Sequence, residues 1–134
     1  MAYGPKYIRT AAREAWGNVN SAKQVVPGVW EVDTWGHGGY IVAVGPNEPF
    51  VLAEPLRIDR FLCTSYTWAG VPLVTYYMFE EDCDYAVLLA AHPEVREAVN
   101  RKRAKWGGMP IVREDVVAVI MRWNPDFLSV AVTA

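Results

Sequence analysis

The chain has 134 residues, of which 52% are apolar and 21% are charged, and its formal net charge is −2. Six Trp, seven Tyr and four Phe argue against a disordered chain, which would be poor in aromatic residues. Two Cys argue against a disulfide-built scaffold, and the acidic balance argues against nucleic-acid binding by bulk charge. The sequence therefore predicts a single folded domain over residues 1–134, with no cofactor indicated.

Targeting signals are absent from the sequence as it stands. The first twenty residues carry several charges and no apolar run of signal-peptide length. The longest apolar runs, 85–91 and 116–121, are far shorter than the roughly 18 residues that a membrane span needs. We therefore expect an intracellular protein that makes no membrane contact and keeps Cys63 and Cys83 as thiols.

The N-terminal part predicts one helix followed by a hairpin. Apolar residues recur at three- and four-residue spacing over 6–16, which is typical of an amphipathic helix. Residues 18–23 look like a polar turn. Apolar and polar side chains then alternate over 29–35, which indicates a half-buried strand with Trp30 on its buried face. The glycine-rich residues 36–39 connect this strand to a return strand over 40–44.

The rest of the chain predicts a second hairpin and then helices. Residues 50–53 suggest a short strand or edge piece, and residues 63–68 and 71–79 form strand-like runs separated by Gly70. Helices are predicted over 83–91, from Pro93 to the Gly107-Gly108 pair, and over 113–123, where a strand is the second choice for the β-branched residues. This order predicts an α+β fold, with an antiparallel sheet built from N-terminal and central hairpins and packed against three to four helices.

The glycine-rich hairpin tip carries a histidine, His37, as a candidate functional residue. Gly36, Gly38 and Gly39 allow a sharp turn and a close approach of the backbone to a ligand. A histidine at such a tip can serve as a general base or a metal ligand. The alternative is that the glycines only make the turn and that His37 is a partly exposed spectator.

A second candidate is the acidic segment from Glu80 to Asp84. On a helix, Glu80 and Cys83 would lie on one face, and a cysteine near a helix N-terminus can become nucleophilic. The surrounding carboxylates, Glu81 among them, oppose a thiolate, which favours Cys83 as a small core residue. No metal site is predicted, because the sequence lacks Cys-x-x-Cys and paired histidine spacing.

A third candidate is the basic stretch over residues 101–106. Arg101 and Arg103 beside Trp106 could contact phosphate groups and stack on a base. Basic residues also stabilise the C-terminal end of a helix, so a solvated helix end is the simpler interpretation. The sequence has no nucleotide-binding glycine loop, and nucleic acid is not the expected partner.

Three motifs occur together in a characteristic order. They are Ala15-Trp16-Gly17, the run from Pro27-Gly28-Val29 to Thr34-x-x-His37-Gly38-Gly39, and Phe79-Glu80-Glu81-Asp82-Cys83. Over residues 10–95 the chain resembles a bacterial and phage domain of unknown function that carries these motifs. The resemblance implies a phage or mobile-element setting in the cytoplasm of a bacterial host, and it implies no reaction.

Two function classes follow from these features. The leading hypothesis is an accessory protein that binds a protein partner or a second copy of itself, including inhibition of a host protein. Its expected contact residues are the aromatic and basic residues Trp35, His37, Tyr40, Trp68, Arg101, Arg103 and Trp106. The alternative is a small enzyme that uses His37 with Cys83, Glu80 or Glu81. The distance between the His37 ring and these side chains discriminates the two classes.

Overall fold

The structure, a computed structural model, describes residues 5–133, except for the side chains of residues 5, 6, 68, 71, 72, 132 and 133. The chain divides into two compact units, the first ending at Glu81 and the second beginning at Asp82. The single domain over residues 1–134 stays a prediction. No helix among the described residues is long and apolar enough to cross a membrane.

The first unit begins with the predicted amphipathic helix, α1 (Pro5–Trp16). Its apolar stripe is buried, because Ile8, Ala11 and Ala12 have no exposed surface. Gly17 ends the helix at φ +94°, and its N–H donates to the carbonyl oxygen of Arg13 at 3.0 Å. The expected helix over residues 6–16 is therefore confirmed.

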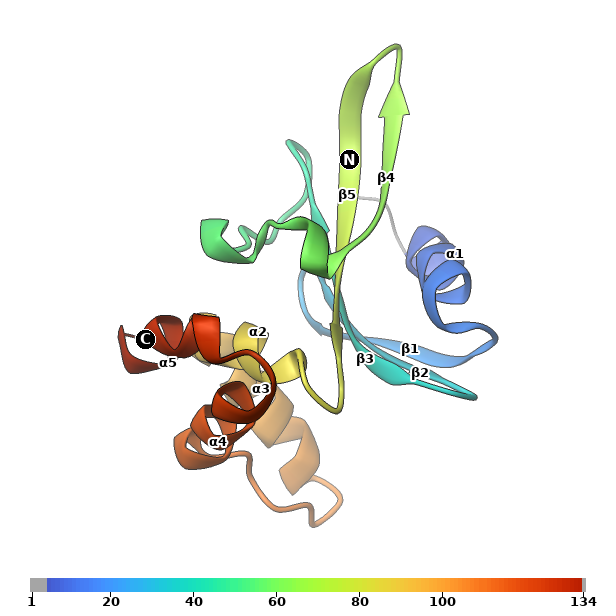
Figure 1. Cartoon of the computed structure of the whole chain (residues 1–134). Coiled ribbons are helices and arrows are strands. Elements are labelled where there is room, and N and C mark those ends of the chain that lie inside the picture. The colour runs from blue at the N-terminus through green and yellow to red at the C-terminus, as the bar shows by residue number, and fades with distance from the viewer. Residues whose placement is uncertain (1–4, 134) are drawn as a thin grey trace. The chain divides into compact units, whose positions relative to one another are not determined.

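One antiparallel sheet follows, in the strand order β1-β2-β3-β5-β4. Its members are β1 (Val19–Val26), β2 (Val29–Thr34), β3 (Gly38–Val44), β4 (Leu62–Trp68) and β5 (Val71–Glu80). Both predicted hairpins are present, and β4 with β5 extends beyond the neighbouring strands in Figure 1. The polar turn predicted over residues 18–23 is wrong, because residues 19–23 belong to β1, which pairs with β2.

The segment between β3 and β4 contains two short 3-10 helices, η1 (Glu54–Leu56) and η2 (Asp59–Phe61). The strand expected over residues 50–53 is wrong, since these residues have no ladder partner in the described sheet. Leu52, Leu56 and Phe61 are nevertheless fully buried, so apolar burial rather than pairing explains the hydrophobic pattern there.

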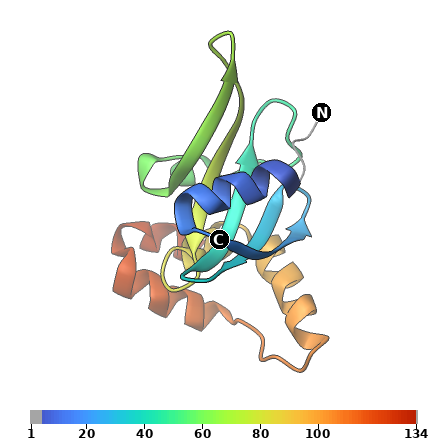
Figure 2. The same ribbon diagram turned by 90° about the vertical axis from the view of Figure 1, so that its right-hand side faces the viewer.

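The core of the first unit lies between α1 and one face of the sheet, as Figure 2 shows with α1 lying across the strands. Trp30 and Val32 of β2 point into this core, whereas Asp33 between Val32 and Thr34 is exposed. The alternation predicted for this strand is confirmed. The core cluster consists of Ile8, Ala11, Ala12, Trp30, Val32, Ile41, Ala43, Val74 and Tyr76.

The second unit is helical. It contains α2 (Tyr85–Ala91), α3 (Pro93–Ala104), α4 (Arg113–Trp123), the 3-10 helix η3 (Pro125–Phe127) and α5 (Leu128–Thr133). Pro93 opens α3, as predicted, and Asn124 with Pro125 follows the end of α4. The helical choice for residues 113–123 is confirmed, and the α+β class is confirmed. The described chain holds five α-helices rather than three to four, because α5 was missed.

Candidate functional site

Two of the three sequence motifs meet at one end of the sheet. Strands β3 and β5 are antiparallel neighbours, and Gly39 is paired with Glu80. One residue further, the N–H of Glu81 donates to the carbonyl oxygen of Gly38 at 2.9 Å. This pairing places the hairpin tip beside the last residues of β5, although the two segments are about forty residues apart in the sequence.

Gly39 makes the close approach of these two strands possible. Its φ of +151° is a conformation that residues with a side chain rarely adopt. A Cβ atom at this position would lie 2.2 Å from the carbonyl oxygen of Phe79, which belongs to the backbone and cannot move aside. The glycine therefore determines the position of the hairpin tip relative to Glu80.

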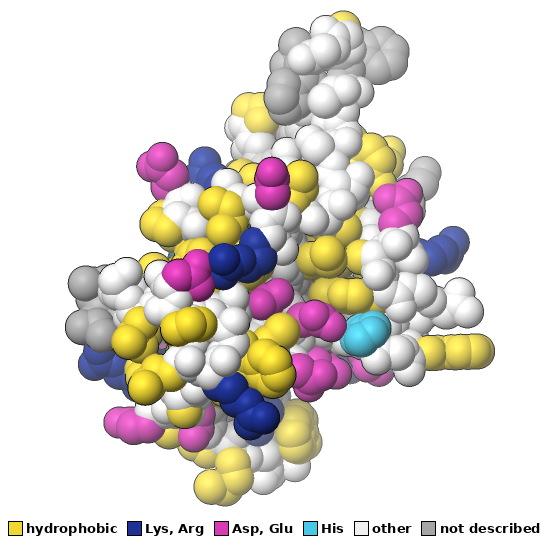
Figure 3. Space-filling view, in the orientation of Figure 1, with side chains coloured by type: hydrophobic (Ala, Val, Ile, Leu, Met, Phe, Trp, Pro, Cys, Tyr) yellow, Lys and Arg dark blue, Asp and Glu magenta, His cyan; other side chains and the backbone are white. Residues whose placement is uncertain are grey.

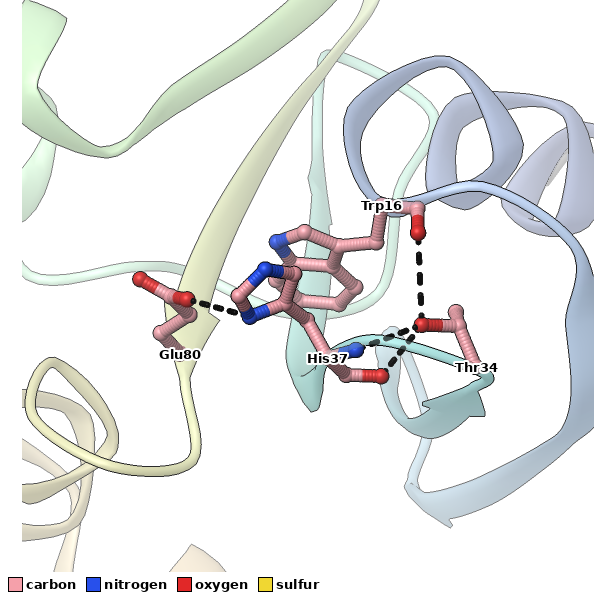
Figure 4. A network of polar contacts seen from close by, with 4 residues as sticks. All are labelled: Trp16, Thr34, His37 and Glu80. Atoms are coloured by element: carbon pink, nitrogen blue, oxygen red, sulfur yellow. Dashed lines mark hydrogen bonds and ion pairs between the residues drawn. The ribbon is translucent and has the colours of Figure 1, made fainter.

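Thr34 fixes the backbone of His37 across the turn. The N–H of Thr34 donates to the His37 carbonyl at 2.9 Å, and the N–H of His37 donates to Thr34 Oγ1 at 3.0 Å. The Thr34 hydroxyl also contacts the carbonyl oxygens of His37 and of Trp16. Figure 4 shows this network, which brings the end of α1 and thus the third motif to the same place. Thr34 is buried, so water does not compete strongly for these bonds.

The imidazole of His37 is paired with the Glu80 carboxylate. His37 Nδ1 lies 3.1 Å from Glu80 Oε1, and the two side chains are 56% and 36% exposed. A carboxylate at one ring nitrogen orients the imidazole and leaves Nε2 to accept or donate a proton. The geometry therefore brings together one of the residue pairs that the enzyme hypothesis needs. The carboxylate of Glu81 lies beside the Gly38 backbone.

The helical arrangement expected for Glu80 and Cys83 is wrong. Glu80 is the last residue of β5, residues 81–84 form a turn, and α2 begins only at Tyr85. Glu80 and Cys83 therefore do not share a helix face. Cys83 is half-buried within the second unit, and its pairing with His37 stays a prediction.

The other cysteine, Cys63, is a protonated thiol near neutral pH. Burial raises the pKa of Cys63 from 9.0 to about 11, and the negative charge of Glu14 adds to the increase. Its Sγ lies 3.4 Å from the carbonyl oxygen of Ala11, to which the thiol donates. Because the thiolate is the nucleophilic form, Cys63 is unsuited to covalent catalysis.

The expected contact aromatics differ widely in exposure. Trp35 at the hairpin tip is 78% exposed and Trp106 is 69% exposed, whereas Tyr40 is buried at 7%. Tyr40 is therefore unsuited to contact a partner, and the side chain of Trp68 lies outside the described residues. Sequence reasoning missed four further exposed apolar side chains among the described residues of the second unit, Met109, Val112, Met121 and Trp123. Figure 3 shows hydrophobic side chains at the surface next to Lys and Arg side chains.

Trp106 and Met109 belong to a loop, residues 105–112, that is tied down to α3. The side-chain amide of Asn100 donates to the carbonyl of Ile111 at 2.9 Å and accepts from its N–H at 2.7 Å. Arg103 Nε donates to the carbonyl oxygen of Met109 at 2.7 Å. The loop is thus held at two points, by Arg103, which the sequence indicated as a contact residue for a partner, and by Asn100, which it did not single out.

The ring of Trp106 rests on its own loop. The guanidinium of Arg103 lies 5.8 Å from the ring centroid, which permits a cation–π interaction. A Cβ on Gly108 would lie 2.7 Å from the ring, so the indole packs directly on the glycine backbone. We call Arg101, Arg103, Lys105, Trp106 and Met109 the basic loop surface.

The chain belongs to the family described as Domain of unknown function (DUF7007), whose match covers residues 9–133. The match extends well beyond residues 10–95, over which the resemblance was noted, and includes the helices of the second unit. No curated protein and no solved structure matches the chain.

Proposed function

We propose that this member of the DUF7007 family acts by binding another protein, and that the basic loop surface makes the contact. The observation that carries the proposal is the exposure of Trp106 and Met109, 69% and 76%, on a loop that Asn100 and Arg103 tie down. Exposed apolar side chains on an ordered loop gain free energy when a partner covers them, and little ordering entropy opposes binding. Trp and Arg are the residue types that most often dominate binding energy.

The sequence resemblance implies a phage or mobile-element setting, and the proposal adopts it. A phage or mobile-element origin favours a host protein as the partner, and inhibition of that protein as the result. Self-association through the same surface is the other form of the proposal. In both forms the chain works without chemistry of its own, and the surface residues determine which partner is bound.

Affinity purification followed by reconstitution tests this proposal. A tagged chain is used to isolate proteins from bacterial lysate, and each partner found is produced in pure form for titration. We expect Trp106→Ala to weaken the pure complex by roughly thirtyfold or more, as for a central aromatic contact. Trp123→Ala is the matched control, because Trp123 is 54% exposed in the same unit and lies outside the basic loop surface.

Two results would refute the binding proposal. One is equal affinity of the Trp106→Ala chain and the original chain for every reconstituted partner. The other is a chain that yields no partner and sediments as a monomer at high concentration. Sedimentation of a dimer that Trp106→Ala dissociates would instead support self-association.

The enzyme hypothesis keeps one specific observation in its favour, the 3.1 Å contact between His37 Nδ1 and Glu80 Oε1. A carboxylate–histidine pair is the orienting half of many general-base sites. Chromogenic ester and phosphate substrates, compared for the original chain, His37→Gln and Glu80→Gln, test it. Turnover above the buffer rate that both variants lose would favour an enzyme, and equal rates in all three chains would count against it.

A further inference from the structure

We infer that the basic loop surface takes an acidic peptide segment that carries an apolar anchor residue. This inference rests on the proposed protein-binding function and names the chemistry of the partner. It is carried by three features of the described residues, namely the local charge, the apolar side chains and the small number of cations that are free to bind.

The charges carried by the end of α3 and by the loop itself have one sign, and the first carboxylate beyond the loop that contacts it is Asp115, which accepts from the Val112 N–H at the loop's end. Between Glu97 and Glu114 the sequence has five Lys or Arg and no Asp or Glu. Arg101 and Lys105 are exposed, and neither side chain makes an ion pair or hydrogen bond with any residue that the structure describes. Carboxylates of a partner segment would complement these two charges and accelerate the encounter.

The apolar part of the surface suits an aliphatic or aromatic side chain. One region of the Trp106 ring is occupied by Gly108 and Arg103, while 69% of the residue stays exposed. Met109 follows on the same loop at 76% exposure, and Val112 at its end is 43% exposed. Methionine is a flexible apolar side chain that adapts to varied protein partners. The surface therefore offers an apolar contact flanked by positive charge.

The number of free cations argues against nucleic acid. The Arg103 guanidinium already donates to the Met109 carbonyl and lies over the Trp106 ring. Arg101 and Lys105 are therefore the exposed cations of the basic loop surface whose side chains can bind a ligand. Two phosphate contacts on a single strand give a salt-dependence slope of only about −1.4, far less than that of a protein that makes roughly 6–10 such contacts. One or two carboxylates beside an apolar anchor match the surface better.

Fluorescence anisotropy with defined probes tests the partner chemistry. A labelled peptide that repeats Glu-Glu-Leu-Ser is the probe, and we expect it to bind the full chain. A peptide with Leu replaced by Gly, one with Glu replaced by Lys, and an oligothymidine of equal length are the comparison probes. We expect each comparison probe to bind at least about tenfold more weakly.

Substitutions in the basic loop surface test whether the acidic peptide binds there. We expect Arg101→Glu with Lys105→Glu, and separately Trp106→Ala, to weaken the acidic peptide by about tenfold or more. Arg9→Glu is the matched control, since Arg9 is an exposed cation on α1 in the other unit, and we expect it to leave the affinity unchanged within about twofold. Circular dichroism of each variant confirms that it is folded.

Weaker binding of all three comparison probes and of the surface variants would support the acidic-peptide inference. Tighter binding of oligothymidine, or equal binding of the Gly and Leu peptides, would overturn the assigned partner chemistry. No binding of the acidic peptide would overturn it as well. If a reconstituted protein partner still depends on Trp106, the protein-binding function stands and only its partner class is wrong. If that dependence is also absent, the proposed function fails too.

Discussion

Replacing Trp30 with alanine should remove the largest side chain from the core beneath α1. Trp30 is 6% exposed and packs in one cluster with Ile8, Ala11 and Ile41. A buried aromatic side chain removes about 150–250 Å² from water, which at about 25 cal/mol per Å² corresponds to about 4–6 kcal/mol. Measured truncations of buried Phe and Trp cost about 3–5 kcal/mol. Since domains are stable by only about 5–15 kcal/mol, the effect should be large.

Urea and thermal unfolding, followed by circular dichroism, measure this loss. We expect Trp30→Ala to lower the melting temperature by roughly 10–20 °C. Asp33→Ala is the matched control, because Asp33 is exposed on the opposite face of the same strand and should cost less than about 0.5 kcal/mol. Equal melting temperatures of the two variants would refute the assignment of Trp30 to the core. If neither variant is destabilised, α1 does not contribute to stability through this cluster.

Four further outcomes follow from the first unit. Gly39→Ala should destabilise the chain by more than about 2 kcal/mol in urea unfolding, because its Cβ would meet the Phe79 carbonyl at an unfavourable φ; wild-type stability would contradict this strand approach. Tyr66→Phe should raise the free energy of unfolding by about 1 kcal/mol, since the Tyr66 hydroxyl is buried without a hydrogen-bond partner among the described residues, and a loss of stability would count against it. Because the folded chain raises the pKa of Cys63 from 9.0 to about 11, the stability that its neutral thiol contributes is complete below pH 9.0 and is lost as the pH rises toward about 11. Alkylation of Cys63 should follow the same raised pKa, and a reaction midpoint near 9.0 would show that the thiol is not protected.

Local sequence signals identified most elements of this fold. Helices α1 and α3 follow from the spacing of their apolar residues and from Pro and Gly at their ends, which act on the backbone within a few residues. The alternation in β2 identified Trp30 as buried, because the two faces of a strand differ in solvent exposure. Residue type alone did not determine exposure, because Trp35 and Trp106 are exposed whereas Tyr40, which was expected with them as a contact residue, is buried.

The sequence did not predict the edge strand β1 or its pairing with β2. The polar residues of β1 look like a turn, since none of the eight residues of this edge strand is fully buried and two irregularities interrupt its register with β2. The strand exists because β2 supplies hydrogen-bond partners. Glu80 was also misassigned from the sequence. Its acidic neighbours suggested a helix start, but Glu80 is the last residue of β5 because it pairs with Gly39 of β3.

The amino-acid sequence by itself determined the α+β class, the hairpin tip with His37 and the basic segment after residue 100. Only the tertiary structure decided that His37 lies 3.1 Å from Glu80 and that Asn100 holds the loop carrying Trp106. The physical reason is the range of the forces involved. Periodicity and capping act between residues close in sequence, whereas these contacts require hydrogen bonds between segments that meet only after the chain has folded.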